Sequence, residues 1–391
     1  MVAPQLSATP AHPLFALSIP PAPHPRILAS LDMASTNIVS NTRVVRASYA
    51  NKARVTEAQF RVESNLEIDL ASVKEGEVIL RNLYLSLDPY VRFTLDETGG
   101  ETPASWRTLN DPFYGLGVAE VVASGCEKYP VGTLVSVNTG YEKYTRVAGL
   151  NDPNTASDIR VLPAHARDES TGVPLSNYIS ALGMPGLTAF AGLKVLGIEA
   201  GKTIFVGSAA GGVGQLVGQL AKTQGLRVIG SAGSDEKVSY LAEKQHFDGA
   251  FNYKTEDARE ALARLAPNGI DYYYDTVGGE ILDLVLETIN DMGKILSIGM
   301  VSQENGKEPY PIRNLNHIAR KGASILGFIY WHHLKYFTNG ELDGTIRPLL
   351  ERKEINYREE VFDGIENAPK HFVNMLDGKY AGKVIIKIAD L

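Results

Sequence analysis

The stretch Thr203-Ile-Phe-Val-Gly-Ser-Ala-Ala-Gly-Gly-Val-Gly214 decides the fold of this chain. It opens with an apolar run and leads into a helical pattern that continues to residue 223, so it predicts a strand, a tight turn and a helix. Ser208, Gly211 and Gly214 have the spacing of a dinucleotide-binding fingerprint, in which small residues let the backbone approach a pyrophosphate. Gly212 and Val213 complete the loop, and the following helix would offer free amides to the phosphates. The stretch therefore predicts a dinucleotide site.

The sequence around this stretch alternates between strand-like and helix-like runs. Strands are predicted at residues 227–229, 250–253, 270–276 and 294–298. Helices are predicted between them, at residues 235–244, 256–265 and 280–289. Alternation at this spacing is typical of a parallel sheet with helices on both faces. Residues 172–339 are therefore predicted to form an α/β domain, a Rossmann-type doubly wound parallel sheet.

The first part of the chain has a different pattern. Short β-branched or apolar runs at 78–85, 118–124 and 134–138 are separated by Gly, Pro and Asp, without helical segments between them. Residues 37–171 are therefore predicted to form a β-rich domain. The alternating residues 383–388 predict a further strand, and residues 340–391 are expected to complete this domain.

Residues 1–36 are predicted to be a disordered extension. Seven of the 20 prolines lie within residues 1–25, and no acidic residue precedes Asp32. Proline removes amide donors and fixes φ, so no stable helix or strand pattern is left. A targeting segment, or an upstream start with Met33 as the alternative initiator, are the other interpretations.

Composition excludes several classes of protein. The 391 residues carry 38 Lys and Arg against 45 Asp and Glu, a net charge of -7 that argues against nucleic-acid binding. No run has the ~18 uncharged apolar residues of a membrane helix, so no membrane partner is expected. Cys126 is the only cysteine, which excludes a disulfide within the chain. These features favour a cytoplasmic location.

The end of the second predicted strand indicates which dinucleotide binds. An NAD site needs an acidic residue about 20 residues after the glycine loop, to bind the ribose 2′-hydroxyl. Counting from Gly211 leads instead to Ser231, followed by Ser234 and Lys237. A lysine pairs with a 2′-phosphate, and serines add hydrogen bonds. The sequence therefore favours NADPH over NADH.

Several motifs resemble those of the zinc-independent medium-chain reductases, and most of all the alkenal and enone double-bond reductases of the leukotriene B4 dehydrogenase and prostaglandin reductase type. They include Asn82-Leu-Tyr-Leu-Ser-Leu-Asp-Pro-Tyr-Val-Arg92, Gly183-Met-Pro-Gly-Leu-Thr188 and Tyr274-Asp-Thr-Val-Gly-Gly279. The resemblance is collinear over residues 43–388. It implies a GroES-like β-rich substrate domain beside the Rossmann-type domain, an active site between them, and a homodimer.

The resemblance also implies roles for individual residues. Lys237 and Tyr253 match residues that flank the adenosine 2′-phosphate, and Tyr90 matches an aromatic residue of the substrate pocket. Met184 and Thr188 match cleft positions near the nicotinamide. The positions that match segments lining the cofactor further along the sheet are Thr276, Gly299, Met300 and Val301.

No metal is expected. The zinc enzymes of this architecture need a first-domain cysteine, a Gly-His-Glu segment and a second cysteine or acid, and their structural zinc uses four cysteines. Here Cys126 stands alone, and His165 is the only histidine between His24 and His246. The expected chemistry is therefore hydride transfer from NADPH to the β-carbon of an α,β-unsaturated ketone or aldehyde, with protein hydrogen-bond donors aimed at the enolate oxygen.

The proton donor is left open by the sequence. Many relatives carry a tyrosine where this chain has Glu304, next to the matching segment 299–303. Glu304 could be protonated in an apolar site or could face solvent, and Tyr310 could take the role of donor instead. The substrate is open as well: a stand-alone enoyl reductase for polyketide intermediates, a quinone oxidoreductase and a non-catalytic NADPH-binding protein are the alternatives.

Overall fold

The computed structural model describes residues 37–97, 108–151 and 159–391. The predicted extension, residues 1–36, lies outside the described residues. Two sheets organise the rest, one parallel and one antiparallel. No helix among the described residues is long and apolar enough to cross a membrane.

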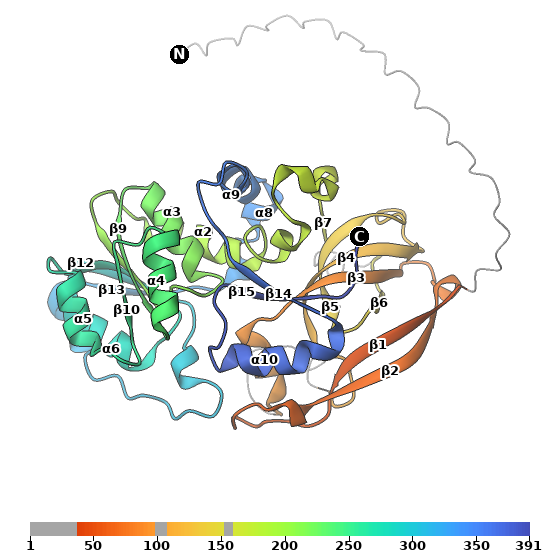
Figure 1. Ribbon diagram of the computed structural model, residues 1–391, viewed down its shortest axis with the longest axis horizontal. Helices are drawn as coiled ribbons and strands as arrows, with labels where there is room; N and C mark the ends of the chain where they lie inside the picture. Colours follow the sequence, from red (N-terminus) through yellow and green to blue (C-terminus); the bar gives the residue numbers. More distant parts are fainter. Residues whose placement is uncertain (1–36, 98–107, 152–158) are drawn as a thin grey trace, which may run out of the picture. The chain divides into compact units, whose positions relative to one another are not determined.

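The second half of the chain builds a six-stranded parallel sheet (Figure 1). Its strands are β8 (Thr203–Val206), β9 (Arg227–Ala232), β10 (Gly249–Asn252), β11 (Ile270–Asp275), β12 (Ile289–Ser297) and β13 (Ser324–Gly327). Their order in the sheet is β10-β9-β8-β11-β12-β13, and every neighbouring pair is parallel. This is the strand order of a Rossmann fold. From β8 the chain first adds strands on one side, β9 and β10, and then crosses back to add β11, β12 and β13 on the other side. Ligands of such folds bind outside the carboxyl ends of the strands at that point.

Helices connect these strands and pack against them. They are α2 (Met184–Leu196), α3 (Gly214–Thr223), α4 (Asp235–Lys244), α5 (Ala258–Leu265), α6 (Gly279–Thr288), α7 (Asn316–Lys321), α8 (Lys335–Thr338) and α9 (Glu341–Glu351). Local chemistry fixes where two of them begin: Ser234 Oγ accepts a hydrogen bond from Lys237 N at the start of α4, and Asp257 Oδ1 accepts one from Glu260 N at the start of α5. Phe205 and Tyr273 lie in the same buried cluster as residues of α5, and their rings stack with centroids 5.0 Å apart.

The helix predicted at 280–289 ends one residue early, and the strand predicted at 294–298 begins five residues early. Helix α6 ends at Thr288, and Ile289 has extended backbone angles as the first residue of β12. Ile289 is 1% exposed and pairs with Ile270 of β11. Burial in the sheet therefore overrides the helical pattern at this position.

The other sheet is antiparallel for most of its length. It consists of β3 (Val78–Ser86), β4 (Tyr114–Ser124), β5 (Leu134–Gly140), β6 (Tyr144–Val147), β7 (Arg160–Val161), β14 (Glu359–Asp363) and β15 (Lys383–Lys387), and a separate hairpin consists of β1 (Ile38–Arg46) and β2 (Phe60–Asp69). The C-terminal strand β15 pairs with β3, where Ile386 lies opposite Leu85. Helix α10 (Ala368–Leu376) lies between β14 and β15 in the sequence. The chain thus combines a Rossmann-type α/β sheet with a GroES-like β-rich part. Residues Asn37–Leu391 form one compact unit, and the domain limits 37–171, 172–339 and 340–391 stay a prediction.

Candidate functional site

The glycine loop joins the end of β8 to the start of α3. Gly211 N donates to Ser208 O at 2.9 Å, and Ser208 has a φ of +49°, which closes a tight turn. A Cβ on Gly214 would lie 2.6 Å from Ser208 O and 2.7 Å from Ala209 Cα, so only glycine fits at the start of this helix. Gln215 N makes the first bond of the helix, to Gly211 O, and the amides of Gly212, Val213 and Gly214 precede it. Amides at this position have no partner within the helix, so they suit an anionic ligand.

Residues from the ends of three neighbouring strands meet beside this loop. Thr276 follows β11, and its Oγ1 donates to Gly207 O at 3.2 Å. Gly299, Met300 and Val301 follow β12, and Val301 N donates to Thr276 O at 3.2 Å. Met300 and Val301 are 45% and 39% exposed, which leaves two apolar side chains uncovered at the carboxyl end of the sheet. Four of the residues predicted to line the cofactor therefore do come together.

Asp275 holds this arrangement and was not among the predicted residues. It is fully buried at the end of β11, and its Oδ1 accepts hydrogen bonds from Val277 N at 2.9 Å and Gly278 N at 2.8 Å. Burial raises the pKa of its carboxyl, and the backbone donors oppose that rise. These bonds fix the turn that presents Thr276.

The end of β9 gathers the residues predicted at the 2′-phosphate. Ser231 is 2% exposed in β9, Ser234 caps α4, and Lys237 lies in the first turn of α4. Tyr253 covers the turn between them, because a Cβ on Gly233 would lie 2.9 Å from Tyr253 Oη.

Lys237 is half-buried and its ammonium forms no ion pair among the described residues. Its Nζ donates to the backbone oxygen of Gly378 at 2.7 Å, and no carboxylate of the described residues lies within ion-pair distance. Burial lowers the pKa of this ammonium, as do the positive charges of Lys254 and Arg358, whereas Glu360 and Glu236 raise it. An ammonium with donors to spare, beside a strand end that has no acid, fits a cofactor with a 2′-phosphate.

Met184 and Thr188 lie at the start of α2. Gly183 is the N-cap of this helix, and Thr188 is 6% exposed with its backbone oxygen bonded to Tyr274 Oη at 2.6 Å. Because Tyr274 belongs to β11, this bond holds the first turns of α2 against the centre of the parallel sheet.

Tyr90 lies on the β-rich side, in the short helix η3 (Pro89–Leu95). Burial raises the pKa of its hydroxyl well above the ordinary value, and so do the nearby Asp88, Tyr330 and Tyr141. The influence of Tyr330 is informative because Tyr330 follows β13 of the parallel sheet. Residues from both parts of the chain therefore influence the pKa of this hydroxyl, and Tyr330 was not predicted from the sequence.

Glu304 lies where the loop after β12 meets the β-rich part. Burial raises the pKa of its carboxyl, and a hydrogen bond from the Met300 backbone and the charge of Arg92 oppose the rise. The neighbouring Asn305 accepts a hydrogen bond from Val55 N at 2.7 Å, which anchors the loop. Glu304 is thus partly buried near Arg92 rather than fully exposed to solvent.

Tyr310 faces a helix of the Rossmann-type sheet. Its Oη lies 3.5 Å from Asp283 Oδ2 on α6, and its backbone N donates to Gln303 Oε1 at 2.6 Å. Asp283 also accepts bonds from the backbone of Arg313 and Asn314. The contact with Asp283 favours a structural role for Tyr310 over that of proton donor.

A buried ion pair links the β-rich part to the glycine loop. Lys383 Nζ lies 2.7 Å from Asp88 Oδ1, and both side chains are 5% exposed. The Lys383 side chain also lies against the loop, since a Cβ on Gly212 would be 3.2 Å from Lys383 Cδ. Gly382, which precedes Lys383, donates a hydrogen bond from its backbone N to Ala210 O at 2.6 Å. Sequence patterns near the loop gave no signal for these contacts, because the residues lie at the far end of the chain.

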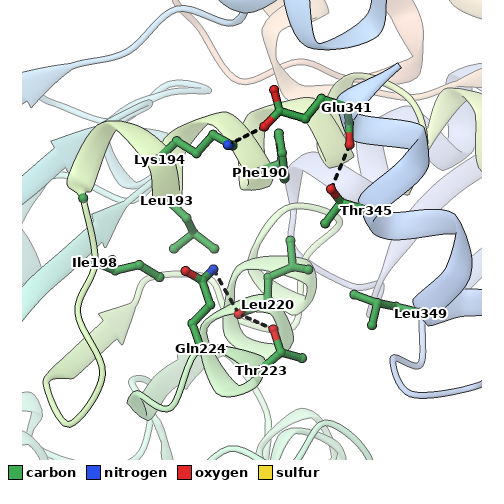
Figure 2. Close-up of a pocket in the computed structure, with 11 residues that line it drawn as sticks. Phe190, Leu193, Lys194, Ile198, Leu220, Thr223, Gln224, Glu341, Thr345 and Leu349 are labelled. Atoms are coloured by element: carbon green, nitrogen blue, oxygen red, sulfur yellow. Dashed lines mark hydrogen bonds and ion pairs between the residues drawn. The ribbon is translucent and has the colours of Figure 1, made fainter. Parts of the chain in front are cut away.

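A hollow on the described surface lies elsewhere. It has a volume of about 400 Å³ and lies between α2, α3 and α9, as Figure 2 shows. Lys194 and Glu341 form an ion pair of 2.5 Å across one side of it, and Phe190, Leu220 and Leu349 line its apolar part. None of the predicted site residues lines this hollow, so it is not the candidate site.

Among the described residues, no group of three or more His, Cys, Asp or Glu side chains could hold a metal ion. The expectation that this chain works without zinc stays a prediction, which metal analysis of the purified protein would test.

Comparison with known proteins identifies the family. Residues 212–342 match the family described as zinc-binding dehydrogenase, and residues 48–152 match the N-terminal domain of oxidoreductase. The 2-alkenal reductase (NADP(+)-dependent) of Nicotiana tabacum is 38% identical over 90% of this chain and 98% of its own length. Prostaglandin reductase 1 of Rattus norvegicus is 37% identical over 84% of this chain and 95% of its own.

A solved structure agrees with these relatives. CurA from Vibrio vulnificus in complex with NADPH superposes with a TM-score of 0.78 and 30% identity, covering 90% of this chain and 100% of that one. The glycine loop, the strand end without an acid and Lys237 agree with these similarities. The chain belongs to the medium-chain dehydrogenase/reductase family, among its NADP-dependent double-bond reductases.

Proposed function

We propose that this protein reduces the carbon–carbon double bond of α,β-unsaturated ketones and aldehydes with NADPH. The proposal rests on one observation above all: the segment Gly299–Val301, which we propose to line the cofactor, continues directly into Glu304 and Asn305, which reach Arg92 and Val55 of the β-rich part. The same short helix carries Arg92 and Tyr90. The name of the tobacco relative, 2-alkenal reductase (NADP(+)-dependent), supports an enal substrate.

The residues that would hold the cofactor fall into three groups. The amides of Gly212, Val213 and Gly214 would hold the pyrophosphate, and Lys237 with Ser231, Ser234 and Tyr253 would hold the 2′-phosphate. Met184 and Thr188 would lie near the nicotinamide, with Thr276, Gly299, Met300 and Val301 along the rest of the cofactor. When bound, NADPH supplies the hydride that the β-carbon of the substrate receives.

Two side chains are proposed to serve the substrate. As the double bond is reduced, negative charge grows on the carbonyl oxygen, and a hydrogen-bond donor aimed at that oxygen stabilises it. The Tyr90 hydroxyl can donate such a bond at neutral pH, because its raised pKa keeps it protonated. Glu304 is proposed to deliver the proton to the α-carbon, since burial favours the protonated carboxyl that this step needs.

Product analysis tests this function. Purified protein is mixed with NADPH and a linear trans-enone or trans-2-alkenal, and the product is identified by NMR. We expect the saturated ketone or aldehyde, with the carbonyl intact, and no consumption of NADPH with the saturated analogue. An allylic alcohol as product would contradict the proposal, because it shows reduction of the carbonyl.

The same assay with further substrates separates the alternative functions. Turnover of benzoquinones but not of enones would identify a quinone oxidoreductase. Activity only with an acyl chain tethered to a carrier protein would identify a polyketide enoyl reductase. NADPH binding without consumption of any substrate would identify a non-catalytic binding protein.

We also propose that the protein is a homodimer. The support is the outermost strand of the parallel sheet, β13, which has no neighbour on one side among the described residues. Apolar side chains on or after this strand are exposed: Ile325 at 37%, Trp331 at 49% and Leu334 at 40%. Exposed edges of this kind pair readily with another strand. Light scattering should give twice the mass of the chain, and Ile325→Lys should reduce it to that of one chain.

A further inference from the structure

We propose that Arg358, from the segment before β14, is a further residue that selects the phosphorylated cofactor by binding its 2′-phosphate beside Lys237. This inference rests on the assignment of the NADPH site, and not on which substrate is reduced. It extends the site to a part of the chain that lies outside both matched family regions, 48–152 and 212–342.

The first observation is a cluster of positive charge with too few partners. Lys237, Lys254 and Arg358 are close enough that the latter two lower the pKa of the Lys237 ammonium. Only two carboxylates, Glu236 and Glu360, act on Lys237 in the opposite direction. Arg358 already contacts both of these carboxylates, so a bound anion would relieve the repulsion between Lys237 and its positive neighbours.

The second observation is that the main chain of Arg358 is fixed to the helix of the glycine loop. Arg358 N donates to Gln215 Oε1 at 2.9 Å, and Gln215 Nε2 donates back to Arg358 O at 3.0 Å. Gln215 is fully buried in the first turn of α3. The Arg358 oxygen also accepts a bond from Lys383 N at 3.0 Å. Arg358 is therefore held at a constant position relative to the pyrophosphate-binding loop.

The third observation is where the guanidinium points. Its Cζ lies 5.4 Å from the centre of the Tyr240 ring on α4, and its Nη1 lies 3.7 Å from Glu236 Oε1 in the first turn of the same helix. Its Nη2 lies 3.0 Å from Glu360 Oε1. The charged group is thus aimed at the first turn of α4, where Lys237 and Ser234 also lie.

These contacts leave the guanidinium free to bind a phosphate. The Glu236 side chain is 80% exposed and its contact with Arg358 is long, so water can replace Arg358 there at little cost. Glu360 holds one edge of the guanidinium, and the other edge can bind phosphate oxygens. A lysine contributes a point charge, whereas an arginine adds a planar pair of donors that matches a phosphate. The ribose 2′-hydroxyl of NADH offers no charge to either residue.

Nucleotide fragments test this assignment without the need for a substrate. Calorimetry compares 2′,5′-ADP with 5′-ADP on the full-length protein and on Arg358→Gln, with Arg352→Gln as the matched control. Arg352 is a surface arginine that pairs with Glu354. We expect Arg358→Gln to weaken 2′,5′-ADP by about 10- to 100-fold and to change 5′-ADP by less than about twofold. The control should change neither.

A second variant tests the site without touching the arginine. Glu236→Gln removes a carboxylate that competes with the phosphate for Arg358, at a position too exposed to affect folding. We expect it to tighten 2′,5′-ADP by about two- to fivefold and to leave 5′-ADP unchanged. Equal weakening of both nucleotides by Arg358→Gln would overturn the proposal, because it indicates damage to the glycine loop.

The outcomes also separate this proposal from the cofactor assignment. If Lys237→Gln removes the preference for 2′,5′-ADP and Arg358→Gln does not, the NADPH site stands and the role of Arg358 is wrong. If the unmodified protein binds 5′-ADP as tightly as 2′,5′-ADP, the assignment of the 2′-phosphate site itself fails. Neither result depends on turnover of an enone.

Discussion

Lys237 Nζ donates a hydrogen bond to the backbone oxygen of Gly378 at 2.7 Å, which joins the first turn of α4 to the segment that leads into β15. Four residues further along, Gly382 N donates to Ala210 O of the glycine loop at 2.6 Å. The C-terminal segment Gly378–Gly382 therefore touches both the 2′-phosphate end and the pyrophosphate end of the candidate site. Because Lys383 then pairs with Asp88, the same segment connects the cofactor residues to the β-rich part.

Replacement of Lys237 should remove much of the preference for NADPH. In Lys237→Gln the ammonium is lost while the bond from the side chain to Gly378 can persist through the amide. We expect the KM for NADPH to rise by about 10- to 100-fold and the KM for NADH to change little, because a charge-assisted bond to phosphate is lost. Steady-state kinetics with both cofactors measures this. Lys244→Gln, in the last turn of the same helix, is the matched control.

The two candidate tyrosines should differ sharply when each is changed to phenylalanine. Tyr90→Phe removes the hydroxyl proposed to bind the carbonyl oxygen of the substrate, and we expect kcat to fall by about 100-fold with NADPH affinity unchanged. Tyr310→Phe removes only a 3.5 Å contact with Asp283, and we expect nearly full activity. Single-turnover rates and cofactor titrations of both variants test this pair. Loss of turnover in Tyr310→Phe alone would reverse the assignment.

The sequence predicts those features of the fold and the site that are determined by residues close together in the sequence. Strand β8 has the predicted limits because its apolar run, Thr203–Val206, ends at the glycine loop. Helix α4 has the predicted limits because Ser234 caps it and two acidic residues follow in its first turn. The chain order of strands and helices then follows from alternation. The preference for NADPH was also readable, since it depends on residue types at one strand end.

The contacts that join distant segments had no such signal. The bond from Val55 N to Asn305, the approach of Tyr330 to Tyr90 and the pairing of Lys383 with Asp88 all link residues far apart in the sequence. Tyr310 follows Glu304 closely in the sequence, but the chain turns at Gly306, which has a φ of +84°, and the Tyr310 hydroxyl lies beside α6. Its role as proton donor stays a prediction. Tertiary packing alone decides such directions.

Glu304 should make stability depend on pH in a defined direction. Burial raises the pKa of its carboxyl in the folded state above the ordinary value of the unfolded chain, so folding favours the protonated form. Its contribution to stability is complete below the unfolded pKa and is lost as the pH rises through the raised folded pKa. Glu304→Gln cannot ionise, so we expect it to be more stable than the parent at neutral pH and equal to it at acidic pH. Urea titrations across this range measure the difference, and a gap that widens on acidification would contradict it.

Lys383 should be needed for folding stability more than for binding. Lys383→Met leaves Asp88 charged and buried without its partner, and we expect a loss of about 3–5 kcal/mol in the free energy of unfolding. The double variant Lys383→Met with Asp88→Asn removes both charges and should recover a large part of that loss. Denaturant titration of these two variants and of Asp88→Asn alone gives the coupling between the two side chains. Additive losses would show that the pair does not interact in the folded protein.

Gly214 offers the strictest test of the glycine loop. In Gly214→Ala the new methyl group would lie 2.6 Å from Ser208 O and 2.7 Å from Ala209 Cα, so the loop has to move away from the helix that supports it. We expect the affinities for NADPH and for 5′-ADP to fall together, because the loop amides would bind the pyrophosphate of NADPH and the diphosphate of 5′-ADP alike. Gly344→Ala in α9 is the control, because no atom lies within 4 Å of the added methyl and alanine favours a helix by about 0.5–1 kcal/mol. If Gly214→Ala bound both nucleotides as the parent does, the phosphates would have to bind away from this loop.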